Sequence, residues 1–195
     1  VPGPHMETVR SVGAKRAGLV MLAVISMAAT PAPAADEKPA EYAVKAAFLY
    51  SFARFTDWPA AQPDTLHICI LGEDPFGDAF DRVRKAAAPQ PVRIVHTTTL
   101  SPAPSCHILY ISRSESARLG HILALVGTRP VLTVSDVGGF AERGGMVCFV
   151  MRDKRVRFQI NTAAAERAGI GLSAKLLRLA ELVEESDGSN KRPGR

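Results

Sequence analysis

The clearest pattern in the chain is an alternation of short apolar runs with segments of helical spacing. Four runs rich in Ile, Leu and Val are expected to be strands: residues 66–72, 92–96, 106–112 and 130–136. Helical spacing is expected at 73–88 and at 114–127, where Ala117, Ile122, Leu125 and Val126 fall near one face. Continuous apolar strands separated by helices are typical of a parallel sheet that is buried on both faces.

The pattern changes after residue 145. The runs 146–151 and 155–160 are separated by three residues, which predicts an antiparallel hairpin because a parallel crossover needs about a dozen residues. In 155–160 apolar and polar residues alternate, as in a half-solvated edge strand. The predicted fold class is therefore α/β, with a mostly parallel sheet flanked by helices and an antiparallel hairpin toward the C-terminal end.

Three further helices are expected outside this core pattern. The first spans residues 39–58, with an apolar stripe at Val44, Phe48, Phe52 and Phe55. Asn161 is expected to cap a helix at 162–168, which Gly169 ends, and Ser173 to cap a last helix at 174–185.

The first helix is apolar on more than one side. Off its main stripe lie Tyr42, Leu49 and Tyr50. Two interpretations remain open: a core helix under the sheet, or a helix that also contributes to a dimer or partner surface.

The N-terminal residues predict export. Residues 1–5 resemble a cloning scar, and residues 6–34 have the layout of a cleavable signal peptide, with basic residues, a short apolar run and Ala32-Pro33-Ala34 as the cleavage site. The alternatives are a membrane anchor or a buried helix, but the run is shorter than the roughly 20 residues that span a bilayer. We expect one domain at 38–185, a disordered tail at 186–195, and a periplasmic location without direct membrane insertion.

Charge argues against a nucleic-acid partner. The formal net charge is +5, but bases concentrate in the leader (Arg10, Lys15, Arg16) and in the tail (Lys191, Arg192, Arg195). The body is therefore close to neutral and lacks the clustered basic face that nucleic-acid binding requires.

The stretch most like an active site is glycine-rich, from Val134 to Val150 ("VSDVGGFAERGGMVCFV"). Its glycine spacing matches neither a Walker loop nor a dinucleotide loop, and a strand follows it where those motifs need a helix. A phosphoacceptor site is a weaker alternative, because the third strand ends in Ser112 and Asp136 ends the fourth. We interpret the stretch as a structural loop whose glycines permit positive φ.

No motif points to catalysis, a cofactor or a metal. The chain has no G-x-S-x-G elbow, no H-E-x-x-H helix and no zinc-type cysteine spacing. We expect no enzyme activity; a hydrolase would need Asp136 or His107 to act in turnover.

Three cysteines allow at most one internal disulfide. If the strand order is 2-1-3, Cys69 and Cys106 lie on neighbouring strands and can pair, provided their Cα atoms approach closely enough. Unpaired thiols or an intermolecular bond are the alternatives. Cys148 is expected to be a buried small apolar residue.

Several segments, taken in order, resemble the YfiR-like family of secreted bacterial proteins. They are "EYAVKAAFLYSFARFTDWP", "ICILGEDPFG", "CHILYIS", "PVLTVSDVGGFAERGGMVCFV" and "RVRFQINTAAAERAGIGLSAKLLRLA", from about Glu41 to Ala180. The resemblance implies a Rossmann-like sheet and a periplasmic, usually dimeric regulator. Such a regulator binds the periplasmic part of an inner-membrane diguanylate cyclase and represses it, which limits cyclic di-GMP and biofilm formation.

The resemblance also implies an apolar partner surface near the C-terminal end. The matching residues here are Ile170, Leu172, Leu176 and Leu177, for which plain helix packing is the alternative. Better-studied members carry two disulfides, whereas this chain can form one, which puts redox switching through a second bridge in doubt.

A periplasmic small-ligand binder is the alternative function. Doubly wound sheets hold ligands at the carboxyl ends of their strands, where "GEDPFG" and "SDVGGF" would line a cleft.

Overall fold

The computed structural model describes residues 37–59, 64–87, 91–100 and 105–186. Contacts divide the chain into two units, Val1–Ala34 and Ala35–Arg195, and every described residue belongs to the second. The predicted cloning scar, signal peptide and all but the first residue of the predicted tail lie outside the described residues. No helix in the described ranges combines the length and the apolarity that crossing a membrane would require.

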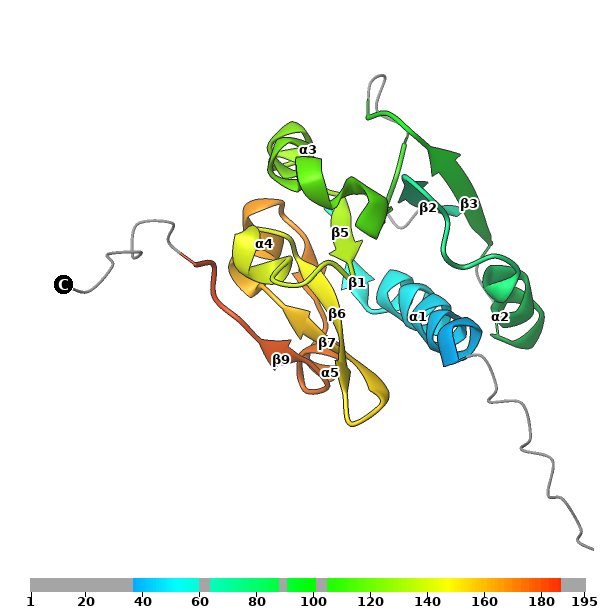
Figure 1. Ribbon diagram of the computed structural model, residues 1–195. Helices are drawn as coiled ribbons and strands as arrows, with labels where there is room; N and C mark the ends of the chain where they lie inside the picture. Colours follow the sequence, from blue (N-terminus) through cyan, green and yellow to red (C-terminus); the bar gives the residue numbers. More distant parts are fainter. Residues whose placement is uncertain (1–36, 60–63, 88–90, 101–104, 187–195) are drawn as a thin grey trace, which may run out of the picture. The chain divides into compact units, whose positions relative to one another are not determined.

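The described residues form a mixed α/β fold around a seven-stranded sheet (Figure 1). Its strands in spatial order are β3 (Val92–Thr97), β2 (Leu66–Leu71), β4 (Ile108–Ile111), β5 (Leu132–Ser135), β6 (Val147–Arg152), β7 (Arg155–Ile160) and β9 (Glu181–Leu182). The pairs from β3 to β6 are parallel and β6–β7 is antiparallel. The predicted fold class and hairpin are thus confirmed.

Helices cover both faces of this sheet. The larger core cluster lies beneath α1 (Glu37–Arg54), α2 (Ala79–Ala87), α4 (Thr162–Arg167) and α5 (Ala174–Leu177). The smaller cluster lies beneath η1 (Arg113–Arg118), α3 (Leu119–Val126) and η2 (Ala141–Arg143). A separate two-stranded ladder pairs β1 (Thr56–Asp57) with β8 (Gly171–Leu172) and so ties the end of α1 to the segment between α4 and α5.

The buried face of α1 is rotated from the predicted stripe. Ala46, Leu49 and Ala53 face the sheet, at the spacing of three and four that one helix face requires. Val44 is 45% exposed instead. The rest of the predicted stripe is confirmed, because Phe52 is fully buried and Phe48 and Phe55 pack against the core, Phe55 just past the end of the helix. Only Val44 was predicted wrongly: small alanines let the helix approach the sheet, and Lys45 is held inward by an ion pair.

The segment 114–127 is also divided differently from the prediction. Residues 113–118 form a 3-10 turn, so the helical face of α3 starts at Leu119 and runs through Ile122 and Val126. Ala117 and Leu125 are exposed, contrary to the predicted face.

The last predicted helix is mostly absent. Asn161 and Ser173 do cap helices, accepting hydrogen bonds from Ala164 N and Leu176 N. The helix after Ser173 ends at Leu177, however, and the chain turns to pair β9 with β7 in parallel. Pairing with the sheet has therefore overridden a sequence of good helix formers.

Cys69 and Cys106 form a disulfide, with their Cα atoms 5.7 Å apart. The strand order β3-β2-β4 makes β2 and β4 neighbours, which is what the pairing required. Cys148 is a buried free thiol, and burial raises its pKa. Both observations agree with the sequence-based expectations.

The glycine-rich stretch connects the parallel strands β5 and β6. Gly144 has φ +92°, a conformation that favours glycine. A Cβ on Gly145 would lie 2.2 Å from Phe140 Cε1 and would clash with the ring. Phe140 itself is fully buried. The glycines therefore serve turn geometry and a close ring contact, as predicted.

Candidate functional site

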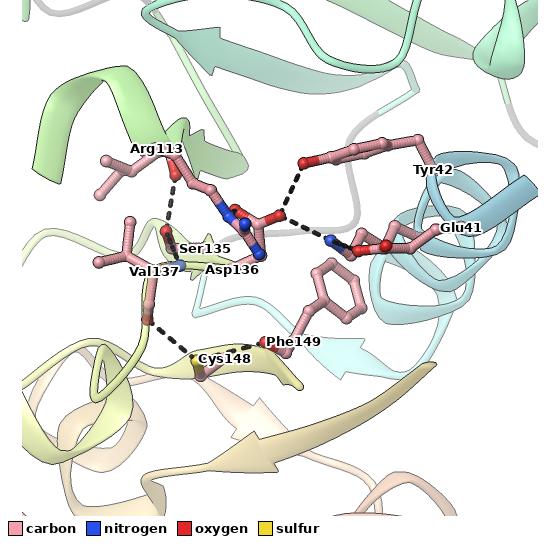
Figure 2. A network of polar contacts seen from close by, with 10 residues as sticks. Glu41, Tyr42, Arg113, Ser135, Asp136, Val137, Cys148 and Phe149 are labelled. Atoms are coloured by element: carbon pink, nitrogen blue, oxygen red, sulfur yellow. Dashed lines mark hydrogen bonds and ion pairs between the residues drawn. The ribbon is translucent and has the colours of Figure 1, made fainter. Parts of the chain in front are cut away.

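The described residues contain one buried cluster of charged groups, centred on Asp136. Asp136 directly follows β5, at the carboxyl end of the parallel strands, where open α/β sheets place their sites. Its partners come from elsewhere in the chain: α1 supplies Glu41, Tyr42 and Lys45, and η1 supplies Arg113 (Figure 2).

One oxygen of Asp136 accepts two hydrogen bonds. Lys45 Nζ donates to Oδ2 at 2.6 Å and the Tyr42 hydroxyl donates to the same oxygen at 2.8 Å. Lys45 also pairs with Glu41 one helical turn away. The other oxygen, Oδ1, lies 3.2 Å from Arg113 Nε without hydrogen-bond geometry. Two carboxylates and two cations therefore balance in charge.

Burial and neighbouring charges determine which side chains of this cluster are ionised. Burial opposes ionisation of Asp136, but the hydrogen bond and charge of Lys45, with Tyr42 and Arg113, outweigh it and hold the carboxyl pKa below its ordinary value. Burial and the hydrogen bond to Asp136 raise the pKa of Tyr42 to about 12. Burial, followed by the charge of Asp136, raises the pKa of the neighbouring Tyr110 far above its ordinary value. Asp136 is thus a stable anion beside protonated tyrosines.

A cleft of about 500 Å³ opens beside the cluster. Asp136 and Arg113 line it, together with Val137, Gly138 and Phe149 and the side of β6. The segment "GEDPFG", expected in the same cleft, is not among the lining residues. Asp74 instead accepts a hydrogen bond from Phe76 N and pairs with His96. The structure therefore brings only one of the two predicted segments to this site.

The geometry of the Asp136 cluster is better suited to holding α1 against the sheet than to transferring protons. A carboxylate that already contacts two cations and a hydroxyl is a weak base. His107 lies at the start of β4, whereas Asp136 follows the end of β5, so the two lie at opposite ends of the sheet. Among the described residues no group of three or more His, Cys, Asp or Glu side chains could hold a metal ion. The cluster chiefly ties α1 to the sheet.

The residues predicted for partner contact are largely internal. Leu49 is 0% exposed, and Ile170 and Leu176 are also in the core. Leu172 and Leu177 are partly buried against that core, as are Tyr42 and Tyr50. In this conformation Leu49, Ile170 and Leu176 offer no surface, so the packing interpretation holds for them. They were chosen for hydrophobicity, which marks a core position as readily as an interface.

The exposed apolar side chains lie elsewhere. Val44 and Met151, the latter 43% exposed, line an open groove of about 720 Å³ between α1 and the β6–β7 hairpin. Three basic residues of the hairpin, Lys154, Arg155 and Arg157, border it. The alternation in 155–160 predicted the solvated face of β7, but nothing in the local pattern predicted that Val44 would turn outward.

Fold and surface together define a mixed α/β protein with a helix fastened to its sheet by a buried ion cluster and an exposed apolar groove beside a basic hairpin. A family model described as YfiR/HmsC-like matches residues 42–181. The chain belongs to the YfiR/HmsC-like family, which confirms the resemblance stated from its motifs.

Proposed function

We propose that this protein is a periplasmic regulator that binds the periplasmic part of an inner-membrane diguanylate cyclase and represses it. It is exported through a cleavable signal peptide, acts as a homodimer and is not an enzyme. The observation that carries the proposal is the family match, which spans most of the α/β domain. Lower cyclic di-GMP and less biofilm are the expected consequences.

The exposed groove supports a binding role. Val44 and Met151 are large apolar side chains at the surface, and such patches mark interaction sites when polar residues surround them. The regulator would act by population shift: it lowers cyclase activity only to the extent that it binds the inactive state of the cyclase more tightly than the active one.

The proposal is tested in a strain that lacks the gene. Intracellular cyclic di-GMP should rise several-fold on deletion and return to the parental level when the full chain is supplied. A double substitution of the exposed groove, Val44→Glu with Met151→Glu, should fail to restore it. The matched control, Leu125→Glu, changes an exposed apolar residue on the opposite face and should restore it fully. An unchanged level on deletion would remove the proposal.

A small-ligand binder is the second candidate, and the cleft beside Asp136 favours it. Equilibrium dialysis of the purified domain against a panel of periplasmic amino acids and amines tests this role. A micromolar ligand that is lost in Asp136→Asn, together with an unchanged cyclic di-GMP level in the deletion strain, would favour the binder over the regulator.

A further inference from the structure

The outer edge of β7 is only half covered. β9 pairs with Gln159 and Ile160 alone, so within the described ranges Arg155 to Phe158 have no strand partner on that side. The hairpin reaches beyond β9 in Figure 1. An uncovered edge of this kind is a template for adding another strand through main-chain hydrogen bonds.

The main-chain N–H and C=O groups along this edge point outward, where they can bond an added strand. Ile160 O accepts a hydrogen bond from Val183 N at 3.0 Å, so the main-chain groups of Ile160 face the β9 side. Because these groups alternate along a strand, those of Phe158 and Val156 face the same way. Asp153 and Lys154, with φ of 48° and 60°, form the two-residue turn that sets this register between Arg152 and Arg155.

The two faces beside the edge differ in chemistry. On one face, Phe158 packs on Phe48 and Phe52 of α1, with ring centroids 5.2 and 5.1 Å apart, and Val156 lines the apolar groove. On the other face stand Arg155 and Arg157, both exposed.

The basic residues here lack acidic partners. In the part of the chain that the structure describes, no carboxylate forms an ion pair with Lys154, Arg155 or Arg157. Among the described residues that line the groove, Glu41 alone is acidic, and it is already paired with Lys45.

The chain's own strand β9 shows what suits this edge. Glu181 lies on the arginine face and pairs with Arg152 at 3.2 Å, whereas Leu182 lies beside Ile160 on the other face. β9 therefore places an acidic residue on the arginine face, where it forms an ion pair, and an apolar residue on the other face, where Leu182 is 61% exposed.

We infer that the free edge of β7 binds an extended segment of a partner protein in which acidic and apolar residues alternate. The acidic side chains lie next to Arg155 and Arg157, and the apolar ones lie beside Val156 on the face that carries the groove. A second copy of β7 fits poorly, because two-fold antiparallel pairing would set arginines opposite arginines. The identification of the partner as a cyclase rests on the proposed function. The inference that this edge binds an extended segment does not depend on it.

The first test uses a blocked ten-residue peptide of alternating Glu and Val as the probe, measured by isothermal titration with the mature chain. A peptide of the same composition, with its Glu and Val in two separate blocks, is the sequence control. Arg155→Glu with Arg157→Glu should weaken binding of the alternating peptide at least tenfold. The control pair Arg82→Glu with Arg93→Glu, exposed on α2 and on the far strand β3, should leave it unchanged.

A second variant separates strand addition from plain charge attraction. Val156→Pro keeps both arginines but removes a main-chain N–H that faces the edge, so it should also weaken binding. Thermal unfolding of each variant shows whether it is folded. The inference is overturned if the block peptide binds as tightly as the alternating one, or if Val156→Pro binds the alternating peptide as tightly as wild type. It is also overturned if the arginine variant still binds the peptide but no longer self-associates.

The same variants distinguish the two proposals in cells. If deletion raises cyclic di-GMP and the arginine variant fails to restore it while the control pair succeeds, the edge is the cyclase contact. If deletion has no effect but the peptide still binds as described, the regulator proposal fails and the binding edge stands.

Discussion

Single residues of this protein matter most where charge is buried. Lys45 and Asp136 are 91 positions apart and both are almost fully buried, so neither is stable without the other. Lys45 is unremarkable in the sequence, and Asp136 stands out only as the acidic residue that ends the fourth predicted strand. Their pairing depends on the packing of α1 over the sheet, which local patterns do not encode.

Replacing Lys45 with Met should cost about 3 kcal/mol of unfolding free energy, because it leaves the Asp136 carboxylate buried without its closest cation. Urea unfolding at neutral pH measures the loss. Lys154→Met, on the exposed hairpin, is the control and should change stability by less than about 0.5 kcal/mol. A second change, Asp136→Leu in the Lys45→Met background, should recover part of the loss.

The cost of Lys45→Met should depend on pH. The folded-state pKa of Asp136 lies below its unfolded value of about 4, so the ion pair stabilises the fold above that value. This stability is lost as pH falls through the lower folded-state pKa. The difference between wild type and Lys45→Met should therefore shrink below about pH 4. A difference that stays constant from pH 7 to pH 3 would contradict the assignment.

The Cys69–Cys106 bridge should contribute about 3–4 kcal/mol, from the restriction it places on an unfolded loop of 37 residues. Denaturant unfolding of Cys106→Ser, compared with wild type in oxidising and reducing buffer, measures this. Reductant should lower the stability of wild type only. If it destabilises the variant as well, the effect comes from something other than the bridge.

At the scale of elements, the N-caps of α4 and α5 are where the sequence was most informative. Asn161 is fully buried and does two things: its Oδ1 accepts from Ala164 N, and its Nδ2 donates to Ala141 O, each at 2.9 Å. It therefore joins the start of α4 to the glycine-rich loop. Ser173 has only the first of these roles, at the start of α5.

Asn161→Ala should consequently cost about 2 kcal/mol, more than the roughly 1 kcal/mol expected for Ser173→Ala, because it removes the buried hydrogen bond to Ala141 O as well as the helix cap. Asn161→Asp keeps the cap oxygen but sets a second carboxylate oxygen against Ala141 O in a fully buried site, so it should cost at least as much as Asn161→Ala. Chemical unfolding of the three variants gives this order. Equal losses for Asn161→Ala and Ser173→Ala would show that the contact with Ala141 contributes nothing.

Strand positions were predictable because the core strands are continuously apolar and the β6–β7 hairpin has a short turn. Helix faces were not. In α1 the difference between the predicted and observed faces is one residue of rotation, and small residues with a single buried ion pair decided it. In the segment after Ser173, the two-residue pairing of β9 ended a helix that the sequence alone would extend to residue 185.

For the whole molecule, fold and family were accessible from sequence while the interaction surface was not. The apolar residues of "AGIGLSAKLLRLA" looked like an interface, yet Ile170 and Leu176 complete the core. The groove is assembled from α1 and a hairpin that starts about a hundred residues later, so no local pattern could show it.

Residues 37–186 should fold as one cooperative domain. α1 begins at Glu37, and Ser186 N still donates to Glu142 O at 2.8 Å. A chain of residues 37–186 should therefore unfold in one cooperative transition, within about 3 °C of the mature protein. Ending the chain at residue 180 removes β9 and the ion pair between Arg167 and Glu185, and should lower the midpoint by at least 5 °C. Equal midpoints for both truncations would mean that β9 does not stabilise the domain.

The most direct test of the central claim is intracellular cyclic di-GMP in the deletion strain when the protein is confined to one compartment. One plasmid supplies the full chain, and the other supplies a chain starting at Asp36, which lacks the predicted signal peptide and stays in the cytoplasm. Regulation from the periplasm predicts that the full chain alone restores the parental level, with equal amounts of both proteins verified by immunoblot. Restoration by the cytoplasmic chain would contradict it.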